Sequence, residues 1–196
     1  MKIFAMILTT GILTQNFVLA RFLGICPFLG VSKKLGTAVG MSVAVTLVMI
    51  LATAATYPIN SALLEPNGLE YLQTIVFILV IAGIVQLLEI LLKRFVTPLY
   101  RSLGIYLPLI TTNCVVLGVV LLNLQAEYSY TQSLVNALGA GLGFLLAMVL
   151  FAGVREKLEG ADIPKFLKGL PATLAAASLV SMSFMGFARL AENLFA

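Results

Sequence analysis

Two cysteines stand out because they are the only two in the chain and because each opens the same short pattern. CPFLG runs from Cys26 to Gly30 and CVVLG from Cys114 to Gly118, so the second pattern follows the first by 88 residues (114 − 26). Cysteine thiolates bind zinc, copper(I) and iron–sulfur clusters, but a buried free cysteine usually packs as a small hydrophobic residue. The matched contexts leave two interpretations open: two packing residues, or two halves of one metal site.

The number of available ligands limits the kind of metal site. Iron–sulfur clusters normally take four cysteine ligands, and this chain offers two cysteines and no histidine. The lack of histidine excludes, within this chain, haem with a histidine ligand, most zinc sites and histidine acid–base chemistry. A metal site here is therefore either smaller than a typical cluster or completed by another subunit.

The elements that must position these cysteines are predicted to be membrane helices. Hydrophobic residues make up 61% of the chain and charged residues 10%, with a mean hydropathy of +1.09, whereas a soluble domain is nearer half apolar and a quarter charged. Because a helix needs about 20 apolar residues to cross a bilayer, we expect an all-α integral membrane protein with six spans in one domain, 1–196. The apolar segments are roughly 3–30, 38–57, 72–92, 103–125, 132–154 and 170–192.

The first and fourth segments, which carry the cysteines, are predicted to be broken helices. The first is too long for one straight crossing, and glycine and proline recur in both segments. Polar residues lie beside these predicted breaks: Asn16 in the first segment, and Thr111, Thr112 and Asn113 in the fourth. Polar groups at helix breaks line ion paths in transporters, so these four residues are candidates for an ion path or for the surroundings of a metal site. Thr111, Thr112 and Asn113 could instead simply satisfy backbone groups that the break sets free.

The distribution of charge predicts the orientation of the segments. Nine of the twelve basic residues lie in three alternate loops, and the intervening loops carry Glu65, Glu70 and Glu127 without a basic residue. The positive-inside rule then places both termini outside and gives the first and fourth segments opposite directions. We therefore predict two inverted three-helix repeats, at about 1–98 and 99–196. The net charge of +4 is explained by orientation and gives no sign of nucleic-acid binding.

Two further stretches carry structural predictions. The small residues of Gly139–Gly143 suit close helix packing. The charged stretch Arg155–Pro164 is predicted to be a solvated loop that anchors a helix end.

Three long motifs closely resemble a known family of membrane subunits. They are NFVLARFLGICPFLGVSKKL (Asn16–Leu35), LGIYLPLITTNCVVLGVVLLN (Leu103–Asn123) and LFAGVREKLEGADIP (Leu150–Pro164). The family is that of the A subunits of Rnf electron-transport complexes, to which the E subunit of the Na⁺-translocating NADH:quinone reductase is closely related. The residues of NFVL and CPFLGVSKK resemble the Rnf branch more closely, and the quinone reductase branch is the alternative.

The resemblance implies six helices in two inverted repeats and a homologous membrane partner of opposite topology, the E subunit. In that family each of the two proteins contributes two cysteines to an intramembrane [2Fe–2S] cluster, and the matching positions here are Cys26 and Cys114. The complex that the resemblance implies would be a ferredoxin:NAD⁺ oxidoreductase of the bacterial inner membrane with further B, C, D and G subunits. It would couple electron flow to transport of Na⁺ or H⁺. This chain would be one subunit of that redox-driven translocase and not catalytic alone. Two rivals remain from the residues: a stand-alone secondary transporter, and a scaffold in which the cysteines only pack.

Overall fold

The computed structural model describes residues 2–14, 16–32, 35–68, 70–95, 109–110, 112–160, 162, 164 and 168–195, and these residues form helices and their connections, with no strand among them. The α-helices are α1 (Lys2–Thr9), α2 (Ile25–Val31), α3 (Leu35–Ile59), α4 (Glu65–Asn67), α5 (Gln73–Phe95), α8 (Cys114–Gln125), α9 (Tyr130–Glu159) and α10 (Leu170–Phe195). The π-helix η1 (Thr10–Thr14) extends α1, the π-helix η2 (Asn60–Leu64) extends α3, and the 3₁₀-helix η3 (Glu70–Leu72) precedes α5. The all-α prediction is confirmed for this part of the chain.

Within the described residues, three helices are long and apolar enough to cross a membrane. They are Leu35–Leu64, Gln73–Ile90 and Tyr130–Leu158, each with a mean hydropathy of 2.2. Cys114–Gln125 and Leu170–Gly186 are shorter apolar helices. The structure thus supplies several apolar helices, and the count of six spans stays a prediction.

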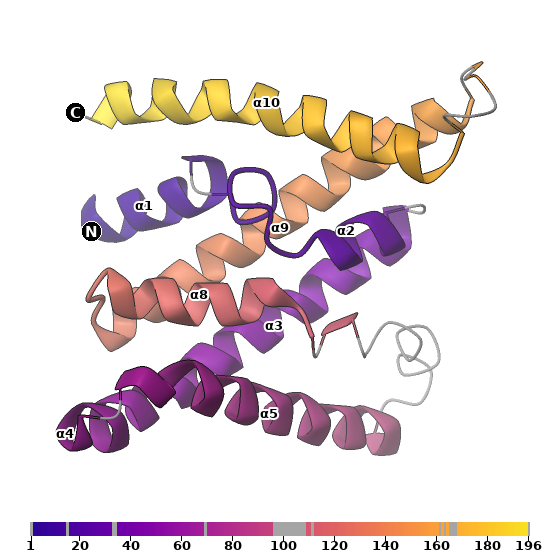
Figure 1. Ribbon diagram of the computed structural model, residues 1–196. Coiled ribbons are helices and arrows are strands. Elements are labelled where there is room, and N and C mark those ends of the chain that lie inside the picture. Colours follow the sequence, from indigo (N-terminus) through magenta and orange to yellow (C-terminus); the bar gives the residue numbers. More distant parts are fainter. Residues whose placement is uncertain are drawn as a thin grey trace.

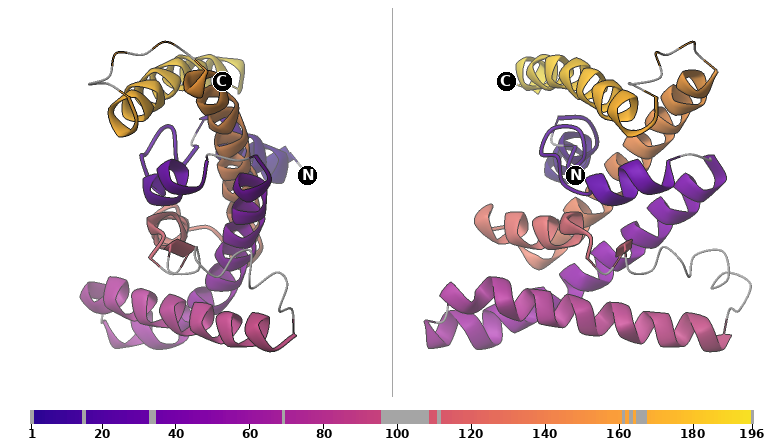
Figure 2. Two further views of the ribbon diagram at one scale, coloured as in Figure 1. Left: turned by 90° about the vertical axis from the view of Figure 1, so that its right-hand side faces the viewer. Right: turned by 45° about the vertical axis from the view of Figure 1, so that its right-hand side comes forward.

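Helices α3 and α9 form the centre of the molecule. They pack extensively against each other, while α5 and α10 lie at opposite edges with this pair between them (Figures 1 and 2). The contact is close because Gly141 of α9 faces α3: a Cβ atom built on Gly141 would lie 2.3 Å from Cγ2 of Thr46. Gly143, also on α9, faces η1 in the same way: a Cβ atom built on Gly143 would lie 2.8 Å from the carbonyl oxygen of Gly11. The predicted close packing at Gly139–Gly143 is confirmed.

The first apolar segment is broken, as predicted. Helix α1 and η1 end at Thr14, residues 16–24 follow in turns, and α2 begins at Ile25. In the fourth segment, Asn113 has extended backbone geometry and caps α8, so α8 begins anew at Cys114. The residues before Leu109 in that segment lie outside the described part.

Two acidic residues, Glu65 and Glu127, lie at one end of the molecule. Both chain termini lie at the same end of the molecule as α4 and the turn between α8 and α9, and α2 runs toward the opposite end (Figure 1). The acidic residues Glu65 and Glu127 therefore lie at the end that carries the termini. The loop predicted for Arg155–Pro164 is wrong at its start, because α9 continues through Glu159. This helical extension lets Arg155 reach back along the bundle to α2.

Candidate metal centre

Cys26 lies at the start of the helix that resumes after the first break. It is the second residue of α2, and its side chain is exposed. Pro27 follows it, where the lack of an amide hydrogen costs little because the first turn of a helix has no internal acceptor for it. The irregular segment therefore ends directly before Cys26, which lies in the first turn of the new helix.

Cys114 occupies the corresponding place after the second break. It is the first residue of α8 and is also exposed. Asn113 caps the helix, since its Oδ1 accepts a hydrogen bond from the amide of Val115 at 3.2 Å. The amide groups of a helix N-terminus favour a negative charge there, which suits a cysteine that acts as a thiolate ligand.

The two cysteine motifs meet in space although 88 residues separate them in the sequence. The backbone amide of Gly24, two residues before Cys26, donates a hydrogen bond to Sγ of Cys114 at 2.9 Å. Gly24 has φ of 82°, and a Cβ atom there would lie 2.5 Å from Cγ2 of Val115. From this meeting point α2 and α8 run toward opposite ends of the molecule (Figure 1). Only glycine combines this backbone angle with so close an approach.

Asn16 holds the first break in place. It is fully buried, and its Nδ2 donates to the carbonyl oxygen of Gly143 on α9 at 2.8 Å. Its Oδ1 accepts from the amide of Val18 at 3.1 Å and from that of Leu19 at 3.4 Å. Ser181 of α10 adds a hydrogen bond to the carbonyl oxygen of Leu19. These contacts show that Asn16 satisfies backbone groups in the break, and its predicted place at an ion path or metal site stays a prediction.

Arg155 and an aromatic pair secure the other end of α2. The guanidinium of Arg155 donates to the carbonyl oxygen of Leu29 and, at 2.9 Å, to Oγ of Ser32, the C-terminal cap of α2. The rings of Phe28 and Phe151 stack with centroids 4.1 Å apart. A helix of seven residues has little stability of its own, so these contacts from α9 fix Cys26. Sequence reasoning missed this role of Arg155 because it assigned the residue to a loop.

Two of the remaining candidates, Thr112 and Asn113, directly precede Cys114 in the described part of the chain. Asn113 is 5% exposed, and its Nδ2 has no hydrogen-bond partner among the described residues. Thr112 is exposed in the turn that precedes α8. Thr111 lies outside the described residues. The structure thus brings Cys114 and Asn113 against Gly24, two residues before Cys26, and Asn16 supports the same break.

The donor set fits a shared metal site and not a complete one. Within the described part of the chain, no group of three or more His, Cys, Asp or Glu side chains could hold a metal ion. Two exposed thiols at adjoining helix starts are soft ligands of the kind that bind iron–sulfur clusters. Their exposure leaves the remaining ligand positions open to a second molecule.

Comparison with known proteins identifies the family. The family model described as "Rnf-Nqr subunit, membrane protein" matches residues 4–191. The A subunit of the Na⁺-translocating ferredoxin:NAD⁺ oxidoreductase complex of Acetobacterium woodii is 58% identical over 181 residues, covering 92% of this chain and 94% of the relative. The A subunit of the ion-translocating oxidoreductase complex of Syntrophotalea carbinolica is 54% identical, covering 97% and 98%, and that of Vibrio cholerae is 48% identical, covering 96% and 98%. These matches extend over nearly the whole chain and include both cysteine motifs, so the chain belongs to the Rnf-Nqr family of membrane protein subunits.

Proposed function

We propose that this chain is the A subunit of an Rnf-type ion-translocating oxidoreductase and acts as one redox-active part of that complex. Relatives at 48–58% identity carry the A-subunit name, and one of them is named as part of a Na⁺-translocating ferredoxin:NAD⁺ oxidoreductase complex. The single observation that carries the redox role is the hydrogen bond between Gly24 and Sγ of Cys114, which joins the two cysteine motifs. A transporter without redox chemistry gives no reason for the exposed Cys114 to contact the turn that lies two residues before the exposed Cys26.

We further propose that Cys26 and Cys114 hold half of a [2Fe–2S] cluster. The cluster needs four thiolates and the chain has two, so a homologous E-type membrane protein supplies the others. When bound, the cluster supplies one-electron transfer. The residues of this chain bind it through two thiolates, and the Gly24 amide donates to one of these sulfurs. Hydrogen bonds to cluster sulfurs are among the features that set the reduction potential, so Gly24 is expected to affect it.

The proposed placement in the membrane follows the charge pattern. Six spans in two inverted repeats would put both termini, Glu65 and Glu127 on the outer side of the bacterial inner membrane. The common end of the termini, α4 and the α8–α9 turn supports this orientation. The B, C, D and G subunits complete the proposed complex and would exchange electrons with the cluster on either side.

Substitution of the cysteines in the assembled complex tests the redox role. Cys26→Ser and Cys114→Ser should each abolish the EPR signal of the reduced intramembrane cluster and remove two iron atoms per complex. Ala175→Ser on α10 is the matched control, because it also introduces a serine at an exposed position and should leave signal and iron content unchanged. An unaltered signal in both cysteine variants, in a complex that retains all subunits, refutes the proposal.

Two other outcomes identify the rival functions. A purified chain that contains no iron alongside its E-type partner and moves solute alone in liposomes is a secondary transporter. Cysteine variants that assemble, keep their full iron content and turn over normally identify the cysteines as packing residues.

A further inference from the structure

A cavity of mixed polarity lies beside the break in the first helix. Its volume is about 240 Å³, and it is lined from α1 and η1, from the break itself, from the end of α8 with the turn that follows, and from the beginning of α9. The α8–α9 turn lies at the end of the molecule that carries the termini (Figure 1), so the cavity belongs to that half of the molecule. Neither cysteine lines it.

Arg21 is the only charged residue among the described residues that line this cavity. It lies within the first apolar segment, three residues before Gly24, and its side chain is exposed. A charged side chain in a membrane segment faces a partner or a polar cavity, because contact with lipid tails is costly. The guanidinium carries five N–H donors in a planar fork that suits phosphate oxygens. An anion can therefore bind here in addition to any contact that Arg21 makes within the chain.

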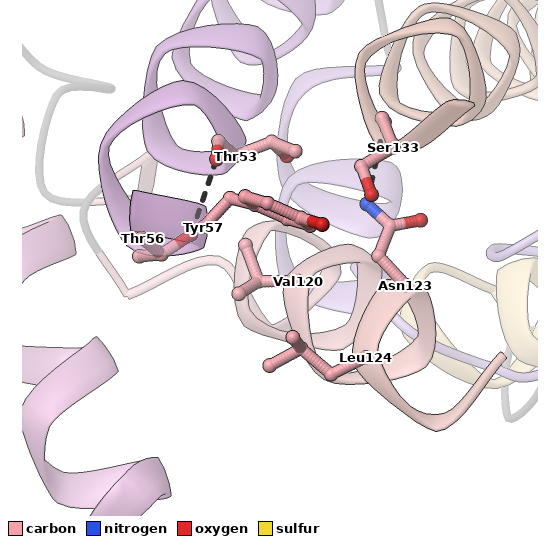
Figure 3. Close-up of a pocket in the computed structure, with 7 residues that line it drawn as sticks. All are labelled: Thr53, Thr56, Tyr57, Val120, Asn123, Leu124 and Ser133. Atoms are coloured by element: carbon pink, nitrogen blue, oxygen red, sulfur yellow. Dashed lines mark hydrogen bonds between the residues drawn. The ribbon is translucent and has the colours of Figure 1, made fainter. Parts of the chain in front are cut away.

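Neutral hydrogen-bonding side chains complete the polar part of the lining. They belong to Thr10, Gln125, Tyr128 and Asn136. Asn136 is held from behind, since its Nδ2 donates to Oδ1 of Asn123 at 2.6 Å. Asn123 donates in turn to the carbonyl oxygen of Ser133 at 3.3 Å (Figure 3). Hydroxyl and amide groups both donate and accept, so the lining suits a ligand that carries phosphate oxygens together with hydroxyl or ammonium groups.

Negative charge is kept away from this cavity. Glu127 lies between two residues of the lining in the sequence, yet it lines the neighbouring cavity together with Glu65. The end of α8 would present partial negative charge through its last carbonyl oxygens. The turn after α8 satisfies carbonyl oxygens there, as the amide of Ala126 does for Leu122 at 3.0 Å. An anion beside Arg21 therefore meets little opposing charge from the described lining.

The apolar part of the lining favours a lipid over a free anion. Ile7, Phe17 and Leu122 contribute to the cavity. Helix α1, which forms one wall, also exposes Phe4 and Met6. A soluble anion gains nothing from such a surface, whereas the methylene groups of an acyl chain bury apolar area against it.

We propose that the Arg21 cavity binds the headgroup of a phospholipid from the outer leaflet. Arg21 binds the phosphate oxygens, and the neutral groups of the lining bind the other polar atoms of the headgroup. The interfacial position agrees with Tyr128, because tyrosine is enriched where a membrane meets water. The site is separate from the cysteines and goes beyond the proposed redox function.

The test uses the intact complex after its bound lipid has been removed by detergent exchange. Thermal unfolding is followed during titration with phosphatidylglycerol, with diacylglycerol, which has acyl chains but no phosphate, and with inorganic phosphate, which has no chains. Native mass spectrometry of the same samples counts the retained lipid. We expect phosphatidylglycerol to be retained and to raise the melting temperature, since a ligand that binds the folded state stabilises it. The other two should have little effect at the same concentration.

A matched pair of variants assigns the effect to this cavity. Arg21→Gln and Lys168→Gln each remove one positive charge from an exposed side chain, but Lys168 lies in the turn before α10 and does not line the cavity. In Arg21→Gln the phosphatidylglycerol concentration for half-maximal stabilisation should rise about tenfold, the effect of losing one charge-assisted hydrogen bond. Lys168→Gln should match the wild type. Gln125→Leu, at an exposed position at the end of α8, should give a smaller rise and serves as the test if Arg21→Gln does not assemble.

Three results would overturn the proposal. The first is an equal half-maximal concentration in the wild type and in the assembled cavity variants. The second is stabilisation by inorganic phosphate as strong as that by phosphatidylglycerol, which would identify a site for a free anion. The third is equal stabilisation by diacylglycerol, which would show that only the acyl chains bind.

Discussion

Replacement of Gly24 by alanine tests whether the meeting of the two breaks is structurally tight. Gly24 has φ of 82°, a conformation that costs a residue with a side chain about 1–2 kcal/mol. The new Cβ atom would also lie 2.5 Å from Cγ2 of Val115 and 3.1 Å from Cε2 of Phe144. Overpacking of this kind costs about 1–3 kcal/mol, so the sum is a loss of about 2–5 kcal/mol. The melting temperature should then fall on the order of 10 °C.

The assay is thermal unfolding of the purified complex followed by circular dichroism, with cluster content measured on the same samples. Gly83→Ala is the matched control, because Gly83 lies within α5 and a Cβ atom there meets nothing within 4 Å. We expect the control to match or slightly exceed the wild type, since alanine favours a helix over glycine. Equal stability of Gly24→Ala and Gly83→Ala would refute the close approach of the two motifs.

Three further substitutions probe the contacts around the site. Asn16→Leu keeps the branched side-chain shape but removes a buried amide that serves four backbone groups, and we expect a loss of about 2–5 kcal/mol, measured by thermal unfolding. Gly141→Ala should destabilise by about 1–3 kcal/mol through Thr46; Thr46→Ala should restore most of this, and a double-mutant cycle without coupling contradicts the contact. In cluster-free protein, Cys114→Ala should be about 1–3 kcal/mol less stable than Cys114→Ser, which keeps an acceptor for the Gly24 amide. Cys26→Ala and Cys26→Ser provide the comparison for that pair, with a much smaller difference expected.

The approach of the two cysteine-bearing breaks could be predicted from the sequence because two independent signals agreed, and the joint metal site stays a prediction. The repeated pattern at Cys26 and Cys114 gave equivalent positions, and glycine and proline near each marked a break. Charge asymmetry gave the two segments opposite directions. The hydrogen bond from the Gly24 amide to Sγ of Cys114 is the contact that agrees with this prediction.

The supporting contacts could not be predicted because each depends on a neighbour distant in sequence. Asn16 bonds to Gly143, 127 positions away, and Arg155 bonds to Ser32 across 123 positions. Neither pair follows from periodicity or local propensity. The charged residues after Arg155 resemble a solvated loop, yet α9 continues to Glu159 because helix formation there is compatible with the contacts that Arg155 makes. The unpartnered hydroxyl of Thr53 is equally invisible in sequence, since only packing decides that Oγ1 of this residue has no hydrogen-bond partner among the described residues.

A broken membrane helix must satisfy the backbone groups that it releases, and here the same groups build the candidate metal centre. The amide of Gly24 would lack an acceptor in the break, and Sγ of Cys114 provides one. The carbonyl oxygen of Leu19 accepts a hydrogen bond from the hydroxyl of Ser181, and the amides of Val18 and Leu19 donate hydrogen bonds to Oδ1 of Asn16. Breaking the first helix therefore brings its backbone to the second cysteine, and the second cysteine in turn stabilises the break. The placement of the cysteines and the interruption of the helices therefore depend on the same contacts, which explains why each cysteine lies in the first turn of a helix that follows a break.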